Sequence, residues 1–262
     1  MESSAAVHER GLGKTLRRDR WWVPPLSVAL GLSLCGAYAT WAVLQGNYYF
    51  AEQFHYLSPF YSPCITASCP EDIRLFGIGW WPLSPAILMM GVILGFRGTC
   101  YYYRKAYYRA YFMDPPACAV GEPWGEGYKG ETVFPMIIQN LHRYFLYASV
   151  VVWLFLTYDT VMAFFPHGQF GMGLGSLVLL VNLFLLSGYL FGCHSLRHII
   201  GGNVDCYSCA FGGKARHGAW KRASWFNKRH MGFAWFSLVF VCLTDLYIRL
   251  VSMGTITDFR LF

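Results

Sequence analysis

The sequence predicts an all-α membrane protein, a polytopic bundle of about five transmembrane helices. Of its 262 residues, 55% are hydrophobic and only 13% are charged, whereas about 25% of the residues in soluble domains are charged. The apolar residues also cluster in blocks of about 20, the length at which a helix crosses a bilayer. These blocks predict spans at about 24–45, 77–97, 143–164, 170–192 and 231–253.

Local signals mark where these spans begin and how they connect. The first span follows Trp21 and Trp22, aromatic residues typical of a membrane interface, and Pro24 suits a helix start. The second follows a similar tryptophan pair and runs on into a basic, tyrosine-rich strip over 101–109. A short turn at 166–168 predicts that the third and fourth spans form an antiparallel hairpin. The fifth span begins after His230.

Lysine and arginine positions predict the orientation of the chain in a cell membrane. Eighteen of the 21 Lys and Arg residues lie before the first span or in the connections after the second and fourth, and such an excess marks the cytoplasmic side. We therefore expect a cytoplasmic N-terminus and an external C-terminus. The predicted parts are a basic arm at 1–20, an anchor domain at 21–262, an external loop at 46–76, and cytoplasmic loops at 98–142 and 199–230.

The net charge of +7 is then a topology signal rather than evidence of nucleic-acid binding, and it suits acidic phospholipid headgroups as partners.

The cysteines, like the cations, divide between the two predicted sides of the membrane. Cys64 and Cys69 lie in the predicted external loop, where a disulfide is permitted. Cys193 and the Cys206-x-x-Cys209 pair lie on the predicted reducing side, where metal ligands are expected more often than disulfides.

The stretch from 192 to 209 carries the densest set of chemically active side chains. His194 and His198 are four residues apart, which places them on one face of a helix. Cys206 and Cys209 follow a glycine break. Two imidazoles and two thiols are a suitable ligand set for zinc or for a Rieske-type cluster. The predicted topology brings further polar residues to the same membrane depth, namely His142, Arg143, Arg197 and His230.

Asp245 lies about 14 residues into the last apolar block. A carboxylate at that depth is costly unless it is paired. Two interpretations follow: a buried hydrogen bond to a neighbouring helix, or a proton or quinone contact.

Three segments in this order resemble those of a known family. Leu141-His142-Arg143 opens the third span, Arg197-His198 with Asp205 follows the fourth, and Leu243-Thr244-Asp245-Leu246-Tyr247 lies in the fifth. They resemble the His-Arg, Arg-His and Asp-Tyr segments in the membrane anchors of succinate dehydrogenase (complex II). The chain is similar to the single-subunit, five-helix anchors of actinobacteria, over about half of its length.

The resemblance also implies a cofactor. In the familiar anchors two histidines ligate haem b, and Phe191 and Ala234 occupy those positions here. The implied type is therefore a haem-free anchor with a Rieske-like [2Fe–2S] cluster, which uses two thiolates and two imidazoles. The expected ligands are Cys206, Cys209, His194 and His198, with Cys193, His142 and His230 as substitutes.

The implied function is that of the anchor subunit of a succinate:quinone oxidoreductase. Such a subunit binds a flavoprotein and an iron–sulfur subunit on its cytoplasmic face and relays their electrons to membrane quinone. Arg143 and Arg197 would orient or polarise a quinone carbonyl, and protons would come from a titratable side chain, namely Tyr247, Asp245 or His142. The sequence has no flavin-binding fingerprint, so we expect succinate oxidation to occur in another subunit.

Two alternatives remain open at this point. One is a haem b cytochrome anchor, of the same complex or of fumarate reductase, with its axial ligands among His142, His194, His198 and His230. The other is a non-enzymatic membrane scaffold with a zinc knob at Cys206-x-x-Cys209.

Overall fold

The structure is a computed structural model of the 262-residue chain. It describes all residues except 1–10, 66–68, 72–73, 75–83, 124–131 and 135. The chain forms two compact units: unit 1 comprises Met1–Gly36 and Arg97–Leu141, and unit 2 comprises Ala37–Phe96 and His142–Phe262.

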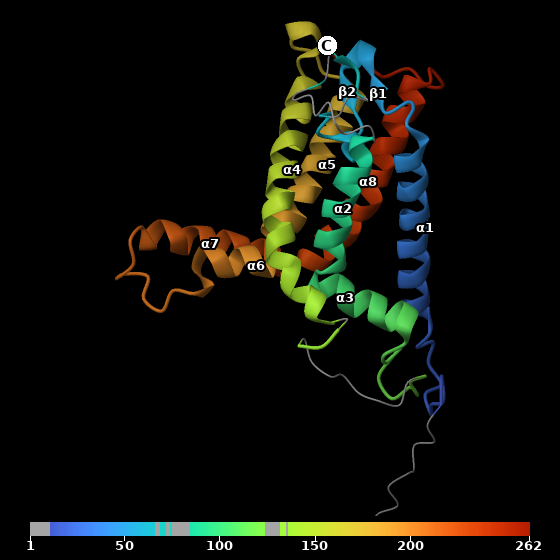
Figure 1. Ribbon diagram of the computed structural model, residues 1–262, viewed down its shortest axis with the longest axis vertical. Coiled ribbons are helices and arrows are strands. Elements are labelled where there is room, and N and C mark those ends of the chain that lie inside the picture. Colours follow the sequence, from blue (N-terminus) through green and yellow to red (C-terminus); the bar gives the residue numbers. More distant parts are fainter. Residues whose placement is uncertain (1–10, 66–68, 72–73, 75–83, 124–131, 135) are drawn as a thin grey trace, which may run out of the picture. The chain divides into compact units, whose positions relative to one another are not determined.

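Helices dominate both units, which confirms the predicted all-α membrane bundle (Figure 1). The helices are α1 (Val23–Gln45), α2 (Pro85–Gly98), α3 (Tyr101–Tyr107), α4 (His142–Met162), α5 (Leu174–Phe191), α6 (His194–Arg197), α7 (Gly213–Asn227) and α8 (His230–Ser252). Two short antiparallel strands, β1 (Phe50–Ala51) and β2 (Tyr56–Leu57), form a hairpin that pairs Phe50 with Leu57. Single 3-10 or π turns occur at Glu52–Phe54, Pro59–Tyr61, Tyr108–Phe112, Met136–Leu141, Pro166–Gly168 and His198–Gly202.

Four helices are long and apolar enough to cross a membrane: α1, α4 with the turn that precedes it, α5 and α8. The second predicted span corresponds to α2, whose 14 described residues start at Pro85, and residues 77–83 of that prediction lie outside the described residues. The fourth span is shorter than predicted because residues 170–173 are not helical. Gly173 instead pairs with Arg260 of the C-terminal tail.

In unit 1, residues 11–20 of the predicted basic arm are held by hydrogen bonds to the segment around residues 118–121. The Gly13 N–H donates to the Gly121 carbonyl at 3.0 Å, and the Gly121 N–H donates to the Lys14 carbonyl at 2.8 Å. The Arg17 guanidinium donates to the Cys118 carbonyl at 2.8 Å. A Cβ at Gly121 would lie 2.0 Å from the Gly11 carbonyl oxygen, so only glycine permits this close approach.

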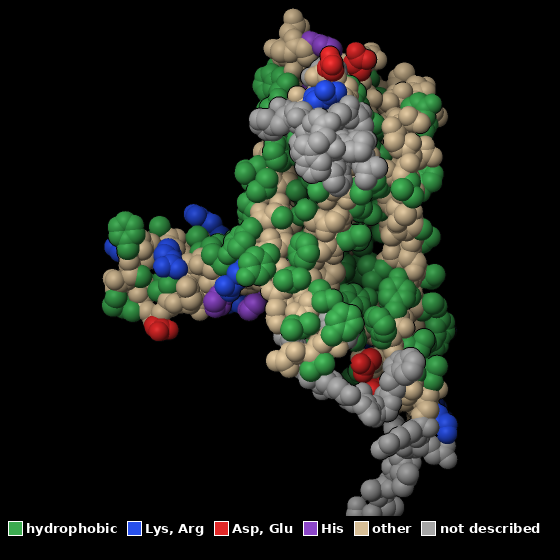
Figure 2. Space-filling model, in the orientation of Figure 1, with side chains coloured by type: hydrophobic (Ala, Val, Ile, Leu, Met, Phe, Trp, Pro, Cys, Tyr) green, Lys and Arg blue, Asp and Glu red, His purple; other side chains and the backbone are tan. Residues whose placement is uncertain are grey.

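In unit 2, α4, α5 and α8 run side by side (Figure 1). Their outer faces expose large apolar side chains such as Leu154, Phe184 and Phe236, as a lipid-facing surface requires (Figure 2). Small residues allow the close packing between helices. A Cβ at Gly188 would lie 2.2 Å from the ring of Phe233 in α8.

One end of unit 2, here called the hairpin end, carries the two strands. There Asp245 and Arg249 form an ion pair with an Nε–Oδ2 distance of 2.7 Å, and their side chains are 0% and 1% exposed. Arg249 also donates to the carbonyls of Asn47 and Ala42, each at 2.7 Å. Tyr38 donates to Asp245 at 2.7 Å, and the Ser58 hydroxyl also donates to it. The ion pair therefore joins α8 to α1 and to the hairpin loop.

A second carboxylate holds the C-terminal tail at the same end. Asp258 accepts hydrogen bonds from Tyr56 at 2.8 Å, from Tyr247 at 2.5 Å and from the Gly175 N–H at 2.9 Å. Burial raises the pKa of Tyr56 to about 12, so this phenol remains a neutral donor at physiological pH. The loop is further closed by a disulfide between Cys64 and Cys69, the pairing that the sequence permits.

The Asp245–Arg249 pair makes a testable contribution to stability. We expect Arg249→Leu to lower the free energy of unfolding by about 3–5 kcal/mol, because it leaves a buried carboxylate without its cation. The double variant Asp245→Asn/Arg249→Leu should recover part of this loss. The measurement is a double-mutant cycle on the detergent-solubilised protein, and additive losses would contradict the assignment.

The α5–α8 contact gives a second stability prediction. Gly188→Ala should destabilise the protein by about 1–3 kcal/mol, because the new methyl group overlaps the Phe233 ring. Gly232→Ala is the matched control in α8, since its Cβ would make only ordinary contacts at 3.9 Å. Equal unfolding midpoints for the two variants would show that the helices are not packed this closely.

Candidate functional site

The opposite end of unit 2, here called the arm end, carries α6 and α7. At this end α4 begins with His142, whose Nε2 lies 3.1 Å from Sγ of Cys193. Cys193 is 1% exposed and precedes α6. The imidazole of His142 also stacks on Phe96, with ring centroids 4.8 Å apart. The start of α4 and the junction between α5 and α6 are therefore in direct contact.

His230 reaches the same junction from the start of α8. Its ring stacks on Tyr189 with a centroid distance of 4.9 Å, and Tyr189 contacts Phe96 edge-on at 5.4 Å. A Cβ at Gly192 would lie 3.1 Å from Nδ1 of His230. Phe96 and Tyr189 thus bridge two imidazoles. These four rings, together with Cys193, are called the imidazole cluster below.

Two arginines border the imidazole cluster. Nη2 of Arg143 lies 3.4 Å from Nδ1 of His198, and both side chains are exposed. Nε of Arg197 donates to the Ser224 hydroxyl at 2.9 Å, and its guanidinium lies 4.8 Å from the centroid of the Trp220 ring. Arg197 is therefore fixed against α7, while Arg143 is open to a ligand.

The predicted convergence of polar residues is thus seen for part of the set. His142, Cys193 and His230 belong to one cluster, and Arg143 meets His198 beside it. The bridging rings were missed by sequence reasoning. Phe96 and Tyr189 lie in apolar blocks, where an aromatic residue that supports a site looks the same as one that faces lipid.

The preferred set of cluster ligands is not gathered in this way. Cys206 and Cys209 are joined by a disulfide, whereas zinc and iron–sulfur sites use thiolates. They lie in the loop between residues 202 and 213. This loop is the outer end of the projection that α7 forms with α6 and the turn His198–Gly202 (Figure 1). Within the described residues, no three His, Cys, Asp or Glu side chains are grouped to hold a metal ion.

The predicted set Cys206, Cys209, His194 and His198 therefore does not fit a Rieske-like cluster in this structure, nor does the cysteine pair fit a zinc knob. The physical reason is that the two sulfurs are bonded to each other, and neither belongs to a group of three or more ligand side chains among the described residues. Among the substitute ligands, His142 and Cys193 form a close pair, which is half of the four ligands that such a cluster requires.

Asp245 and Tyr247 lie apart from the imidazole cluster. Asp245 is 15 residues beyond His230 in the continuous helix α8, a separation of about 22 Å along the axis. Its partners are Arg249, Tyr38 and Ser58, and Tyr247 donates to Asp258. The structure therefore matches the interpretation of Asp245 as a buried, paired group, and its main partner is a cation in its own helix.

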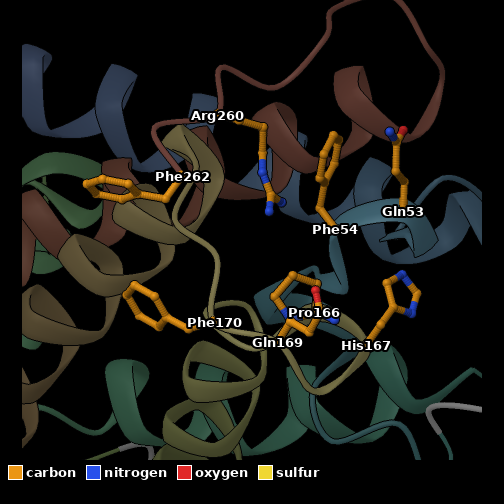
Figure 3. A pocket seen from close by; sticks show the side chains of 8 residues that line it. All are labelled: Gln53, Phe54, Pro166, His167, Gln169, Phe170, Arg260 and Phe262. Carbon is orange, nitrogen blue, oxygen red and sulfur yellow. The ribbon is translucent and has the colours of Figure 1, made fainter.

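A surface pocket of about 480 Å³ lies at the hairpin end. Figure 3 shows its aromatic walls, Phe54, Phe170 and Phe262, and the guanidinium of Arg260 between them. Arg260 lies 5.4 Å from the ring centroid of Phe54. None of the predicted site residues lines this pocket, so the candidate site remains the arm end.

The fold and the site together define a multi-pass helical membrane protein with imidazole, guanidinium and thiol groups gathered at one end of its bundle. The family model for the actinobacterial succinate dehydrogenase subunit SdhC matches residues 23–254. The chain belongs to this family, as the resemblance implied, and is a succinate dehydrogenase membrane anchor subunit.

A solved structure is also similar to the chain. It is the Mycobacterium smegmatis Sdh1 complex in the apo form, with 47% sequence identity and a TM-score of 0.86. The match covers 95% of this chain and 94% of the chain in that complex. A comparison with curated proteins gave no match.

The burial of Cys193 can be tested by alkylation. We expect Cys193 in the folded protein to react with a maleimide on the order of 100-fold more slowly than the exposed Cys118, because reaction requires local opening of the site. Mass spectrometry of peptides after timed labelling measures both rates in one sample. Similar rates would contradict the buried contact with His142.

Proposed function

We propose that this subunit holds the succinate-oxidising subunits at the membrane and passes their electrons to a quinone at the arm end of unit 2. The observation that carries the proposal is a pair of neighbouring contacts between α4 and the α6 segment: His142 meets Cys193, and Arg143 meets His198. The family and the similarity to a chain of the Sdh1 complex support association with a flavoprotein and an iron–sulfur subunit.

Quinone reduction needs two electrons and two protons for each quinol formed. In the proposed mechanism the electrons come from the associated soluble subunits, which oxidise succinate. Arg143 donates a hydrogen bond to one quinone carbonyl and stabilises the negative charge that develops on its oxygen. Both protons come from water at the arm end. The partly buried His142 relays one of them, because it takes up a proton as it releases one, and its contact with Cys193 fixes the orientation of the imidazole ring.

Arg197 has a different place in the proposal. Its bond to Ser224 and its stacking on Trp220 hold α6 against α7, so it is a positioning residue. Its charge also adds to the positive potential beside His198. This charge favours an anionic semiquinone or quinolate at this end of the bundle over the uncharged quinone.

The proposed orientation places the arm end on the cytoplasmic side of the cell membrane. The N-terminus then lies in the cytoplasm and the C-terminus outside. The support is the concentration of Lys and Arg in α7 and in the segments that precede α1 and α4. This orientation presents the quinone site to the cytoplasmic partners that supply its electrons.

The quinone assignment predicts a selective loss of activity. In the purified complex, Arg143→Gln and His142→Ala should each lower succinate:quinone reductase activity by about 100-fold. Succinate oxidation measured with a soluble artificial dye should remain unchanged, because it does not need the anchor site. Arg260→Gln at the hairpin end is the charge-matched control. Full quinone activity in both site variants would overturn the proposal.

Spectroscopy of the purified complex distinguishes the two cofactor hypotheses, a Rieske-type cluster and haem b. Electron paramagnetic resonance after dithionite reduction would report a Rieske-type cluster, and the optical spectrum would report haem b. Cys193→Ser and Cys206→Ser should then be compared. Loss of a cluster signal only in Cys193→Ser would place the cofactor in the imidazole cluster and away from the loop between residues 202 and 213.

A further inference from the structure

Helix α7 has two faces of different character. Its inner face packs on the rest of unit 2: Ala223 is buried, Ser224 binds Arg197, and Asn227 donates to the Gly192 carbonyl at 2.8 Å. Arg216 also faces inward and donates to the Ile200 carbonyl at 2.9 Å. These contacts hold the helix in one orientation, so its other face is consistently presented to the outside.

Five exposed cations lie on this outer face or directly after it. Lys214, Lys221 and Arg222 belong to α7, and Lys228 and Arg229 follow its last residue, Asn227. At 100° per residue, the three cations in α7 cover an arc of about 100°. Trp225 lies at the middle of this arc and is 49% exposed. The Arg229 guanidinium is 4.0 Å from the centroid of the Trp225 ring, and α7 contains no Asp or Glu.

The outer face of α7 lies close to the end of a membrane-spanning helix. Lys228 and Arg229 directly precede His230, where the apolar span of α8 begins. The helix projects sideways from α4, α5 and α8 (Figure 1), and blue basic side chains are visible along it in Figure 2. A helix that leaves the bundle sideways at the end of a membrane span lies at the level of lipid headgroups.

We propose that the outer face of α7 binds the headgroups of anionic phospholipids. Five cations without a carboxylate in the helix complement lipid phosphates, and each contributes about fivefold to the affinity for an anionic membrane surface. The exposed tryptophan suits the boundary between headgroups and acyl chains. An acidic protein surface would match the charge, but it would not account for the tryptophan or for the level of the helix.

The test uses the complete complex, purified in detergent and stripped of lipid, with dioleoyl phosphatidylglycerol as the probe. The triple variant Lys214→Gln/Lys221→Gln/Arg222→Gln removes three outer-face charges. The control variant Arg18→Gln/Arg20→Gln/Lys105→Gln removes three exposed charges from unit 1. Native mass spectrometry measures the lipid affinity, and thermal unfolding verifies that both variants are folded.

The α7 variant should bind phosphatidylglycerol at least tenfold more weakly than the native complex, and the control less than twofold more weakly. Phosphatidylcholine, which has no net charge, should bind equally to all three. Unchanged phosphatidylglycerol affinity in the α7 variant would overturn the proposal. If that variant instead lost its soluble subunits during purification while its lipid affinity stayed the same, the face would be a protein interface.

Discussion

A membrane-spanning helix cannot satisfy stray polar groups with water, and this constraint organises unit 2. Each polar side chain must find a protein partner or lie at an end of the bundle. Asp245 and Arg249 meet the first condition, because both are fully enclosed and neutralise each other. Arg249 additionally satisfies the Ala42 carbonyl in the last turn of α1, a group without a partner inside its own helix.

The hairpin end extends the same solution to two further carboxylates. Asp258 is surrounded by two phenols and a backbone N–H, and the buried Asp159 accepts a hydrogen bond from Ser62. Two of these donors, Tyr56 and Ser62, come from the loop between α1 and α2, which is itself closed by the Cys64–Cys69 disulfide. The buried carboxylates at the hairpin end therefore accept hydrogen bonds from protein donors, and these bonds connect the helices, the loop and the C-terminal tail.

The sequence predicts the helical spans well because hydrophobicity has a simple geometric requirement in a bilayer. On this basis the predicted start of α8, residue 231, is within one residue of the observed start, His230. The ligand prediction was less accurate. His142 and Cys193, which are in contact, had been named only as substitute ligands. Helix α7 was expected to be a loop because lysine, arginine and glycine dilute its apolar residues. The sequence also does not show that Cys206 and Cys209 pair with each other.

The partner of Asp245 illustrates a second limit. Arg249 lies one helical turn further on, and an i,i+4 pair is visible in the sequence. The sequence does not reveal that Trp41 and Tyr61 flank the guanidinium, so a buried carboxylate read on its own suggests proton chemistry. Because Arg249 is enclosed with Asp245, protonation of Asp245 would leave the charge of Arg249 uncompensated in the protein interior.

The arm end has no such obstacle, because Arg143 and His198 are exposed beside the imidazole cluster. The proposed delivery of electrons and protons to a quinone is therefore assigned to the arm end, whereas the neutralised pair stabilises the hairpin end.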